Sequence, residues 1–252
     1  PPKTTIEVNI DMNDEQSKLY EAVRATMQDS IKQIIAQQGF KRSQIQILDA
    51  LLKLRQVCCH PSLLNLDSLP KGKSAVKSKA MHSAKLDYLI ETVTDMVAEG
   101  RKVLIFSQFT SMLALIEQRL QSENIGFSKL TGKTKKRSEA IEAFQSGQVP
   151  VFLISLKAGG VGLNLTTADT VIHYDPWWNP AAEDQASDRA WRIGQDKPVF
   201  VYKLITNQSI EEKILDMQKN KAELAQSILS TDHEGDVKLS EEELLGLFEK
   251  FV

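Results

Sequence analysis

The sequence predicts an α/β protein with an open, doubly wound, mainly parallel sheet, flanked by an N-terminal helical segment and C-terminal helices. Two observations support this class. From residue 84 onward, strand patterns and helix patterns alternate along the chain. The segments 103–106 and 151–154 are uninterrupted apolar runs, as expected of strands that helices cover on both faces of a parallel sheet.

The composition is typical of a soluble globular protein. The 252 residues are 42% hydrophobic and 25% charged, enough for a sizeable core. The 31 basic and 33 acidic side chains give a net charge of −2, so nucleic-acid contacts would have to come from local patches. No apolar run approaches the roughly 18 residues of a membrane span, and no signal peptide is recognisable.

The cysteine content indicates a reducing compartment. Cys58 and Cys59 are adjacent and cannot build a disulfide framework, which is typical of intracellular proteins. Together with His60 they do not make a zinc site, because the chain has no second ligand pair at a suitable spacing. We therefore expect no metal centre. Because the chain starts with Pro1 rather than methionine, we expect it to be a piece of a longer protein.

Residues 1–66 are expected to form a helical segment. After a short alternating stretch at 5–10, helical periodicity covers about 13–38 and 43–59, and Gly39 separates the two helices. The second helix carries little polar surface, so it needs a partner to pack on.

A linker and the α/β domain follow. Residues 67–83 hold lysines among Ser, Gly and Pro with almost nothing to bury, which predicts a basic flexible linker. Residues 84–207 are predicted to form the α/β domain. Its expected elements are helix 84–99, strand 102–107, helix 110–123, strand 126–130, helix 134–146, strand 150–155, strand 170–174, helix 180–193 and strand 199–205.

Residues 208–252 are predicted to hold helices that pack on or brace this domain. One helix opens with the capping box of Ser209 and Glu212 and runs to about residue 230. A second short helix covers 241–250 and opens with another capping box.

Small polar side chains follow the first predicted strand of the α/β domain. In open α/β sheets, ligands bind at the carboxyl ends of the strands. Ser107 and Gln108 stand there, just before a helix N-terminus, which suits an anion. An ordinary helix cap by Thr110 or Ser111 is the alternative interpretation.

A glycine-rich segment follows strand 150–155. Gly159, Gly160 and Gly162 would let the backbone approach a phosphate closely. The pattern is not a dinucleotide-binding fingerprint, because Leu165 stands where the third glycine is needed. The same glycines could instead make only a tight turn.

Tryptophans follow strand 170–174. Trp177 and Trp178 could belong to the core or form a stacking surface. Nearby, the helix 180–193 is expected to pack Ala186, Ala190 and Trp191 inward. Asn179 can cap this helix, and Gly194 suits the left-handed position after its last turn.

The opposite face of the helix 180–193 is expected to carry two arginines. Gln185, Arg189 and Arg192, at i, i+4 and i+7, form one polar stripe, which Asp188 borders. A guanidinium offers a planar fork of donors and stays charged, so the stripe suits a phosphate. A solvated face with local Asp–Arg pairing is the alternative.

The chain contains no complete nucleotide-binding loop. Gly132–Thr134 looks like the end of a Walker A motif, but Phe127 stands where its first glycine should be. The sequence therefore offers arginines and backbone donors for phosphate, without a loop, lysine or magnesium carboxylate that holds a nucleotide by itself.

Four segments resemble helicase motifs of the SWI2/SNF2 (Snf2) family. They correspond to motifs IV, V, Va and VI and cover Lys102–Thr110, Ser155–Thr166, Asp175–Pro180 and Gln185–Gln195. Leu51–Pro61 and Ile210–Ile214 also match helical segments of the family, so the resemblance covers nearly the whole chain. The place of Arg137, three residues after Thr134, looks like that of bacterial members.

The resemblance implies an architecture and an activity. Family members are two-lobed, ATP-dependent double-stranded DNA translocases of helicase superfamily 2. This chain resembles their second, RecA-like lobe with its preceding helical protrusion. The first lobe, with Walker A and DExH motifs, is expected to lie outside the chain. The implied location is the cytoplasm, near the nucleoid, for a bacterial protein and the nucleus for a eukaryotic one.

The resemblance also assigns roles to residues. Arg189 and Arg192 correspond to arginine fingers that reach the ATP γ-phosphate, with Gln185 in the same cleft network. The implied nucleotide-side residues are Asn164, Gly162 and Asp188. The implied DNA contacts are Ser107, Gln108, Lys157, Gly159, Gly160 and Trp177.

The expected cofactor is ATP with Mg²⁺, held mainly by the first lobe. The expected partners are double-stranded DNA and that lobe. On this interpretation, the fragment alone is inactive. The alternative is a self-sufficient α/β module that binds nucleic acid or nucleotide without motor activity.

Overall fold

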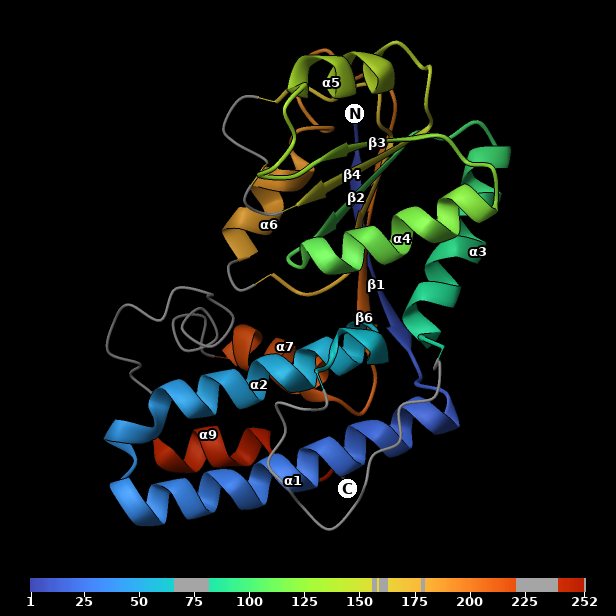
Figure 1. Ribbon diagram of the computed structural model, residues 1–252. Coiled ribbons are helices and arrows are strands. Elements are labelled where there is room, and N and C mark those ends of the chain that lie inside the picture. The colour runs from blue at the N-terminus through green and yellow to red at the C-terminus, as the bar shows by residue number, and fades with distance from the viewer. Residues whose placement is uncertain (66–81, 156–157, 159–162, 178–179, 221–239, 252) are drawn as a thin grey trace. The chain divides into compact units, whose positions relative to one another are not determined.

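The computed structural model describes most of the chain as two compact units (Figure 1). The described residues are 1–65, 82–155, 158, 163–177, 180–220 and 240–251. One unit comprises Pro1–Asn9 and Leu86–Ile205, and the other comprises Ile10–Lys85 and Thr206–Val252. The first contains most of a β-sheet, and the second is mainly helical.

Within the described residues, six strands form one sheet. They are β1 (Lys3–Ile10), β2 (Val103–Ser107), β3 (Phe127–Leu130), β4 (Val151–Ser155), β5 (Thr170–His173) and β6 (Val199–Thr206). Their order is β1-β6-β5-β2-β4-β3. The pairs from β6 through β3 are parallel. Val199 N donates to Pro2 O and Asn207 N donates to Ile10 O, so β1 runs parallel to β6.

Helices cover both faces of the sheet. They are α3 (Ala84–Ala98), α4 (Thr110–Ser122), α5 (Arg137–Gln145) and α6 (Pro180–Ser187). Figure 1 shows α5 and α6 on one side of the strands and α3 and α4 on the other. Every residue of β2 and β4 is buried, as apolar strands between two helical layers must be. The predicted doubly wound α/β class is confirmed.

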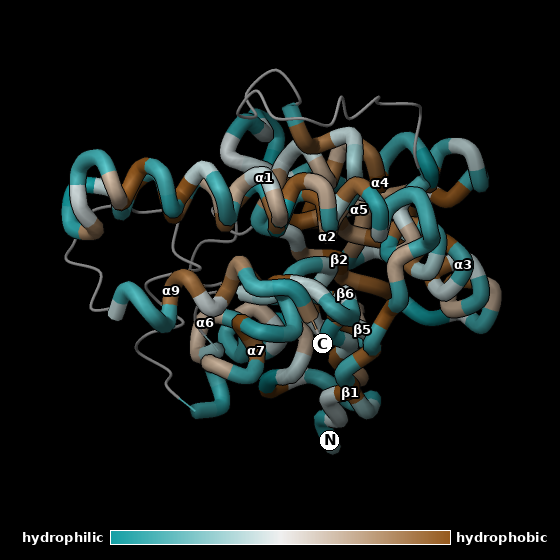
Figure 2. The backbone as a smooth tube through the Cα atoms, turned by 90° about the horizontal axis from the view of Figure 1, so that it is seen from below, coloured by the Kyte–Doolittle hydropathy of each residue, from teal (hydrophilic) through white to brown (hydrophobic). Residues whose placement is uncertain are grey.

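The second unit is mainly helical. Its helices in the described residues are α1 (Asp14–Gln38), α2 (Gln44–Cys59), α7 (Ile210–Asn220) and α9 (Glu241–Leu247), with short 3₁₀ turns η1 (Lys41–Ser43) and η2 (Pro61–Leu63). Helix α2 packs against α1 and α7, and α9 packs against α7. Figure 2 shows hydrophobic and hydrophilic residues alternating along α1. Its N-terminus is capped by Asn13, whose Oδ1 accepts from Gln16 N at 2.8 Å.

Several elements differ from those expected from the sequence. Strand β1 belongs to the sheet, whereas we expected residues 1–66 to form the helical segment. Most β1 side chains are exposed, as on an edge strand, so only the weak alternation at 5–10 indicated it. Helix α5 begins at Arg137, later than expected. The linker 67–83 and the continuation of α7 toward residue 230 fall largely outside the described residues.

No helix in the described residues combines the length and the apolar character that crossing a membrane requires.

Candidate functional site

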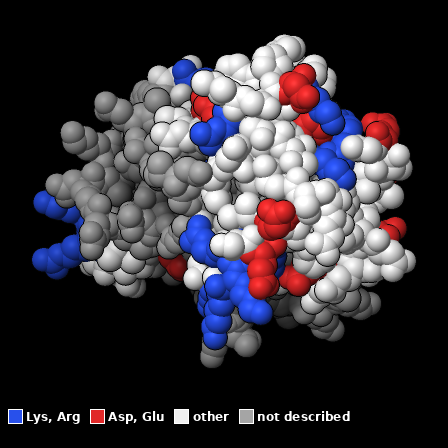
Figure 3. Space-filling model, turned by 90° about the horizontal axis from the view of Figure 1, so that it is seen from above, with Lys and Arg blue, Asp and Glu red and all other residues white. Residues whose placement is uncertain are grey.

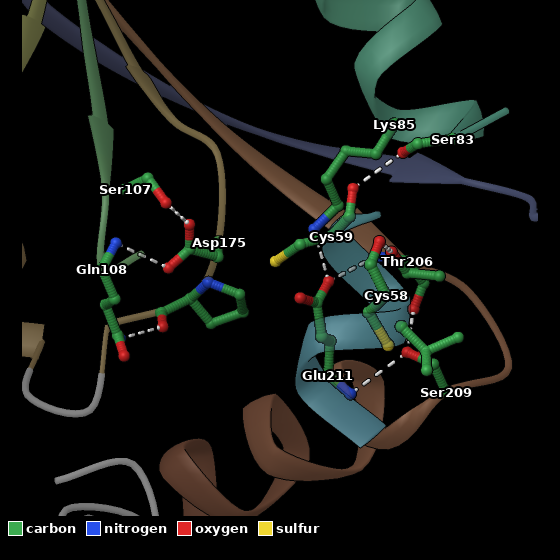
Figure 4. Close-up of polar contacts among 12 residues, drawn as sticks. Cys58, Cys59, Ser83, Lys85, Ser107, Gln108, Asp175, Thr206, Ser209 and Glu211 are labelled. Carbon is green, nitrogen blue, oxygen red and sulfur yellow. Dashed lines mark hydrogen bonds and ion pairs between the residues drawn. The ribbon is translucent and has the colours of Figure 1, made fainter. Parts of the chain in front are cut away.

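Asp175 joins the loops that follow β2 and β5. Its Oδ1 accepts from Ser107 Oγ at 2.5 Å, and its Oδ2 accepts from Gln108 N at 3.0 Å (Figure 4). Gln108 Nε2 also donates to Pro176 O at 2.6 Å. Asp175 is buried, so these charge-assisted hydrogen bonds fix the two loops against each other at the carboxyl edge of the sheet. The sequence pattern gave no indication of this role.

Ser107 is fully buried beneath this edge. Its hydroxyl donates to Asp175 and accepts from Phe109 N at 3.1 Å. A direct contact between this hydroxyl and DNA, which the resemblance implies, would therefore require the turn to rearrange. The structure gives Ser107 a supporting position and leaves Gln108 partly exposed.

Trp177 lies in the core. Its ring makes edge contacts with Phe106 and His173, at centroid distances of 5.9 and 5.6 Å. Of the two interpretations open for this side chain, the structure favours burial over a stacking surface for DNA. Trp178 and Asn179 lie outside the described residues.

The glycine-rich segment is only partly described. Asn164 is exposed beyond β4. The expected site residues Lys157, Gly159, Gly160 and Gly162 lie outside the described residues.

Helix α6 ends at Ser187, six residues earlier than expected, so the two arginines are not on a helix. We call residues 188–195 the arginine loop. After Ser187 the backbone tightens, with Ala190 N donating to Ser187 O. The carbonyl of Arg189 accepts from Leu165 N at 3.0 Å, so this backbone group binds a neighbouring loop instead of extending the helix. The predicted stripe of Gln185, Arg189 and Arg192 on one helix face is wrong.

Gln195 holds the arginine loop from inside. This buried side chain donates from Nε2 to Thr166 O, Ala168 O and Ala190 O at 3.0, 2.7 and 2.9 Å. The bonds join the end of the loop both to its own start and to the segment after the glycines. Gly194, next to it, has a φ of +100°, which favours glycine. The sequence places Gln195 in a motif but indicates no such role.

The two arginines have different surroundings. Arg189 is half-buried with its guanidinium over the Phe106 ring, 5.7 Å from the centroid, and burial lowers the pKa of Arg189. Arg192 is exposed, and its Nη1 donates to Leu163 O at 3.2 Å. Ile193 beside it is fully exposed. The loop therefore presents one arginine to solvent and keeps the other against the sheet.

Trp191 points outward, whereas we expected it to pack inward with Ala186 and Ala190. It is 37% exposed, and its Nε1 donates to Pro1 O at 2.6 Å. The early end of α6 explains the difference, because residue 191 no longer shares a helix face with the two buried alanines.

A buried polar cluster lies between α6 and the sheet. His173 Nε2 is 2.9 Å from Ser187 Oγ, and Lys203 Nζ is 2.7 Å from Glu183 Oε1. Burial lowers the pKa of His173 to about 3, with a further contribution from Lys203. Burial also raises the pKa of Glu183, and Lys203 opposes that shift. The sequence pattern did not indicate this cluster, because His173 and Lys203 are brought together by the register of β5 with β6.

The helical unit contains a buried ion pair. Lys85 Nζ lies 2.6 Å from Glu211 Oε1, with side chains 1% and 2% exposed (Figure 4). Thr206 N donates to the same carboxylate oxygen at 2.9 Å. Burial alone would lower the pKa of Lys85, but the Glu211 carboxylate raises it above its usual value. Burial raises the pKa of the neighbouring Cys58 thiol to about 12.

Within the described residues, no group of three His, Cys, Asp or Glu side chains could hold a metal ion.

Basic and acidic side chains are interspersed on the face shown in Figure 3, where several basic side chains gather together. Such local grouping is compatible with a net charge of −2.

Comparisons with known proteins identify the family. Residues 84–194 match the family model described as helicase conserved C-terminal domain. The solved C-terminal domain of a Sulfolobus solfataricus SWI2/SNF2 ATPase is 32% identical, with coverage of 99% of this chain and 100% of that chain and a TM-score of 0.73. The chain belongs to the SWI2/SNF2 family.

Further SWI2/SNF2 relatives extend the comparison. A Sulfolobus solfataricus SWI2/SNF2 ATPase core, solved in complex with double-stranded DNA, is 35% identical over all of this chain and 51% of that chain, with a TM-score of 0.75. An uncharacterized ATP-dependent helicase of Mycoplasma pneumoniae is 38% identical over 99% of this chain and 23% of its own length. The chain spans about a quarter of the length of the curated relatives it matches.

These matches establish that the first unit, which contains most of the sheet, is the RecA-like C-terminal lobe of a SWI2/SNF2 protein. Relatives from Mycoplasma and Bacillus agree with the bacterial character that the position of Arg137 indicates. In this SWI2/SNF2 lobe, the polar loops after β2 and β5 and the arginine loop are described, and most of the glycine-rich segment is not.

Proposed function

We propose that this chain is the second motor lobe of a two-lobed, ATP-dependent double-stranded DNA translocase. The observation that carries the proposal is the arginine loop. Neutral groups hold its backbone, namely the Gln195 side chain and the amide of Leu165, while the Arg192 side chain remains exposed. An exposed guanidinium on a fixed backbone suits recognition of a phosphate of ATP that is bound by another lobe.

In this mechanism, the first lobe holds ATP with Mg²⁺, and Arg192 and Arg189 act as arginine fingers. The fingers stabilise the charge that develops on the γ-phosphate. Arg192 is exposed and can reach a partner lobe directly, whereas Arg189 would have to leave its position over Phe106. Gln185, exposed on α6, together with Asn164, Gly162 and Asp188, completes the nucleotide side of the cleft.

The proposed DNA surface lies at the carboxyl edge of the sheet. Gln108 is held by Asp175 at the end of β2, and Lys157, Gly159 and Gly160 follow β4 in the sequence. Contacts of this kind go to phosphates and confer grip without sequence preference. The solved relative bound to double-stranded DNA supports this choice of partner. Closure and opening of the two lobes would then step the protein along the duplex.

The test uses a two-lobed protein that contains this chain. Arg192→Ala is expected to lower kcat for DNA-stimulated ATP hydrolysis by about 10³-fold, because a finger acts on the transition state. The free energy of unfolding should stay unchanged, since the side chain is exposed. Arg119→Ala is the matched control, because Arg119 makes a partly exposed ion pair with Asp87 in the same lobe and should leave kcat unchanged.

Two results would count against the motor proposal. One is normal DNA-stimulated hydrolysis by the Arg192→Ala protein. The other is full ATP hydrolysis by residues 1–252 alone, which would favour the alternative of a self-sufficient nucleotide-binding or nucleic-acid-binding module.

A further inference from the structure

The first residues of the chain contact the arginine loop. Lys3 Nζ lies 3.2 Å from Asp188 Oδ1 and 4.8 Å from the centre of the Trp191 ring. Trp191 Nε1 donates to Pro1 O at 2.6 Å. Two residues of the loop are therefore bound from outside by a segment more than 180 positions away in the sequence.

The sheet determines where these contacts lie. Strand β1 pairs with β6, and Val199 N donates to Pro2 O at 3.0 Å. The backbone beside Lys3 is thus held by a sheet hydrogen bond. The Lys3 side chain is 20% exposed, so the ammonium is placed against the loop more firmly than a freely solvated lysine would be.

The residues contacted are the immediate neighbours of the two arginines. Asp188 directly precedes Arg189, and Trp191 directly precedes Arg192. Helix α6 ends at Ser187, and the backbone beyond it is held by single turn bonds, from Ala190 N and Trp191 N to Ser187 O, rather than by a continuing helix. Gln195 holds the inner side of the loop, so contacts with Lys3 supply a second point of support on its outer side.

We propose that Lys3 is a positioning residue for the arginine fingers, which it places by binding Asp188 and Trp191. The inference rests on the proposed function of the loop. A partly exposed ion pair contributes little to folding, but small displacements of a catalytic group lower the rate strongly. The role of Lys3 should therefore appear in the rate of hydrolysis rather than in stability.

The test compares variants of a two-lobed protein that contains this chain. Lys3→Ala is expected to lower kcat for DNA-stimulated ATP hydrolysis about tenfold, with KM for ATP and the thermal unfolding midpoint unchanged. Lys3→Arg should restore most of the rate, because arginine keeps both the charge and the stacking on an indole.

Lys129→Ala is the matched control. Lys129 lies on β3, the opposite edge strand of the sheet, and its Nζ is 2.8 Å from Glu117 Oε2. Lys3 and Lys129 each lie on an edge strand, and each makes a partly exposed ion pair of its own. Among the interactions of the described residues, Lys129 makes no contact with the arginine loop. Its removal should leave kcat unchanged.

Hydrogen–deuterium exchange of the segment 188–195 in the same proteins gives a readout that does not depend on hydrolysis. Lys3→Ala should increase exchange there, and Lys129→Ala should not. Wild-type kcat in Lys3→Ala, alongside a large loss in Arg192→Ala, would overturn the inference and leave the proposed function standing. Unaffected hydrolysis in Arg192→Ala would remove the proposed function, and with it the role of Lys3, even if exchange shows that Lys3 holds the loop.

Discussion

The arginine loop and the Lys85–Glu211 pair use charge in opposite ways. In the arginine loop, neutral amides and carbonyls hold the backbone, and Arg192 is exposed. In the helical unit, Lys85 and Glu211 are both buried and bind each other. Charge enclosed with its partner serves the fold, whereas charge presented on a neutral scaffold is available to a ligand.

Solvation explains the difference. Removing two ions from water is costly, so a buried pair persists only where close geometry and extra hydrogen bonds compensate. The bond from Thr206 N to Glu211 is one such compensation. An exposed guanidinium keeps most of its hydration and can exchange it for a phosphate. Variants of the buried Lys85–Glu211 pair should therefore change stability, and variants of Arg192 should change activity.

Glu211→Ala should have the largest effect on stability. The substitution leaves the Lys85 ammonium buried without its carboxylate, which costs about 3–5 kcal/mol in the free energy of unfolding. Chemical denaturation of the 252-residue chain measures this loss. Replacing both partners by Lys85→Met and Glu211→Leu should cost less than the single change, since no uncompensated charge remains.

Asp49→Ala provides the control for the buried pair. It breaks the ion pair of Asp49 with Lys53 on α2, in which the Asp49 side chain is 55% exposed. The expected cost is below about 0.5 kcal/mol. If Asp49→Ala and Glu211→Ala lowered the free energy of unfolding equally, burial would not determine how much an ion pair contributes to stability.

The sequence predicted the regular elements of the sheet well, because buried parallel strands and amphipathic helices leave strong local patterns. Strand β2 was expected at 102–107 and is found at Val103–Ser107. The edge strand β1 was not assigned to the sheet, because its side chains are mostly exposed and its pairing with β6 is long-range. Local periodicity carries no information about such a partner.

The candidate site was predictable in its residues but not in its local structure. Helical spacing placed Arg189 and Arg192 on one helix, and the helix ends before both. Contacts that Gln195 and Leu165 make across about 25 to 30 positions hold the chain in this non-helical course. The supporting residues Asp175 and Lys3 were missed for the same reason, since each acts on a segment distant in the sequence.

Gln195→Ala should have an intermediate effect on stability. The change removes the donor that serves three backbone carbonyls, two of them through buried hydrogen bonds, and is expected to cost about 1–3 kcal/mol. Gln118→Ala, an exposed glutamine on α4, should cost below about 0.5 kcal/mol. Denaturation curves that coincide for the two variants would show that Gln195 does not hold the arginine loop.

The smallest expected effect on the free energy of unfolding comes from the titration of His173. In contrast to Lys85 and Glu211, this side chain is buried without charge. Its folded pKa of about 3 lies below the usual value, so between these values the unfolded chain binds a proton that the folded chain does not. Stability should therefore fall as pH falls below about 6.5, by about 1.4 kcal/mol per pH unit. Glu183, with a raised pKa, contributes in the opposite direction, and Lys203 faces both groups.

The contribution of His173 can be separated by subtraction. In His173→Asn the residue no longer titrates, whereas the ion pair of Glu183 with Lys203 remains. Between pH 6.5 and 5.5, wild-type protein should lose about 1 kcal/mol more than this variant. Parallel curves would mean that His173 is protonated in the folded chain. The space between α6 and the sheet would then tolerate a cation, and burial alone would not explain why Arg192, in the arginine loop after this helix, is exposed.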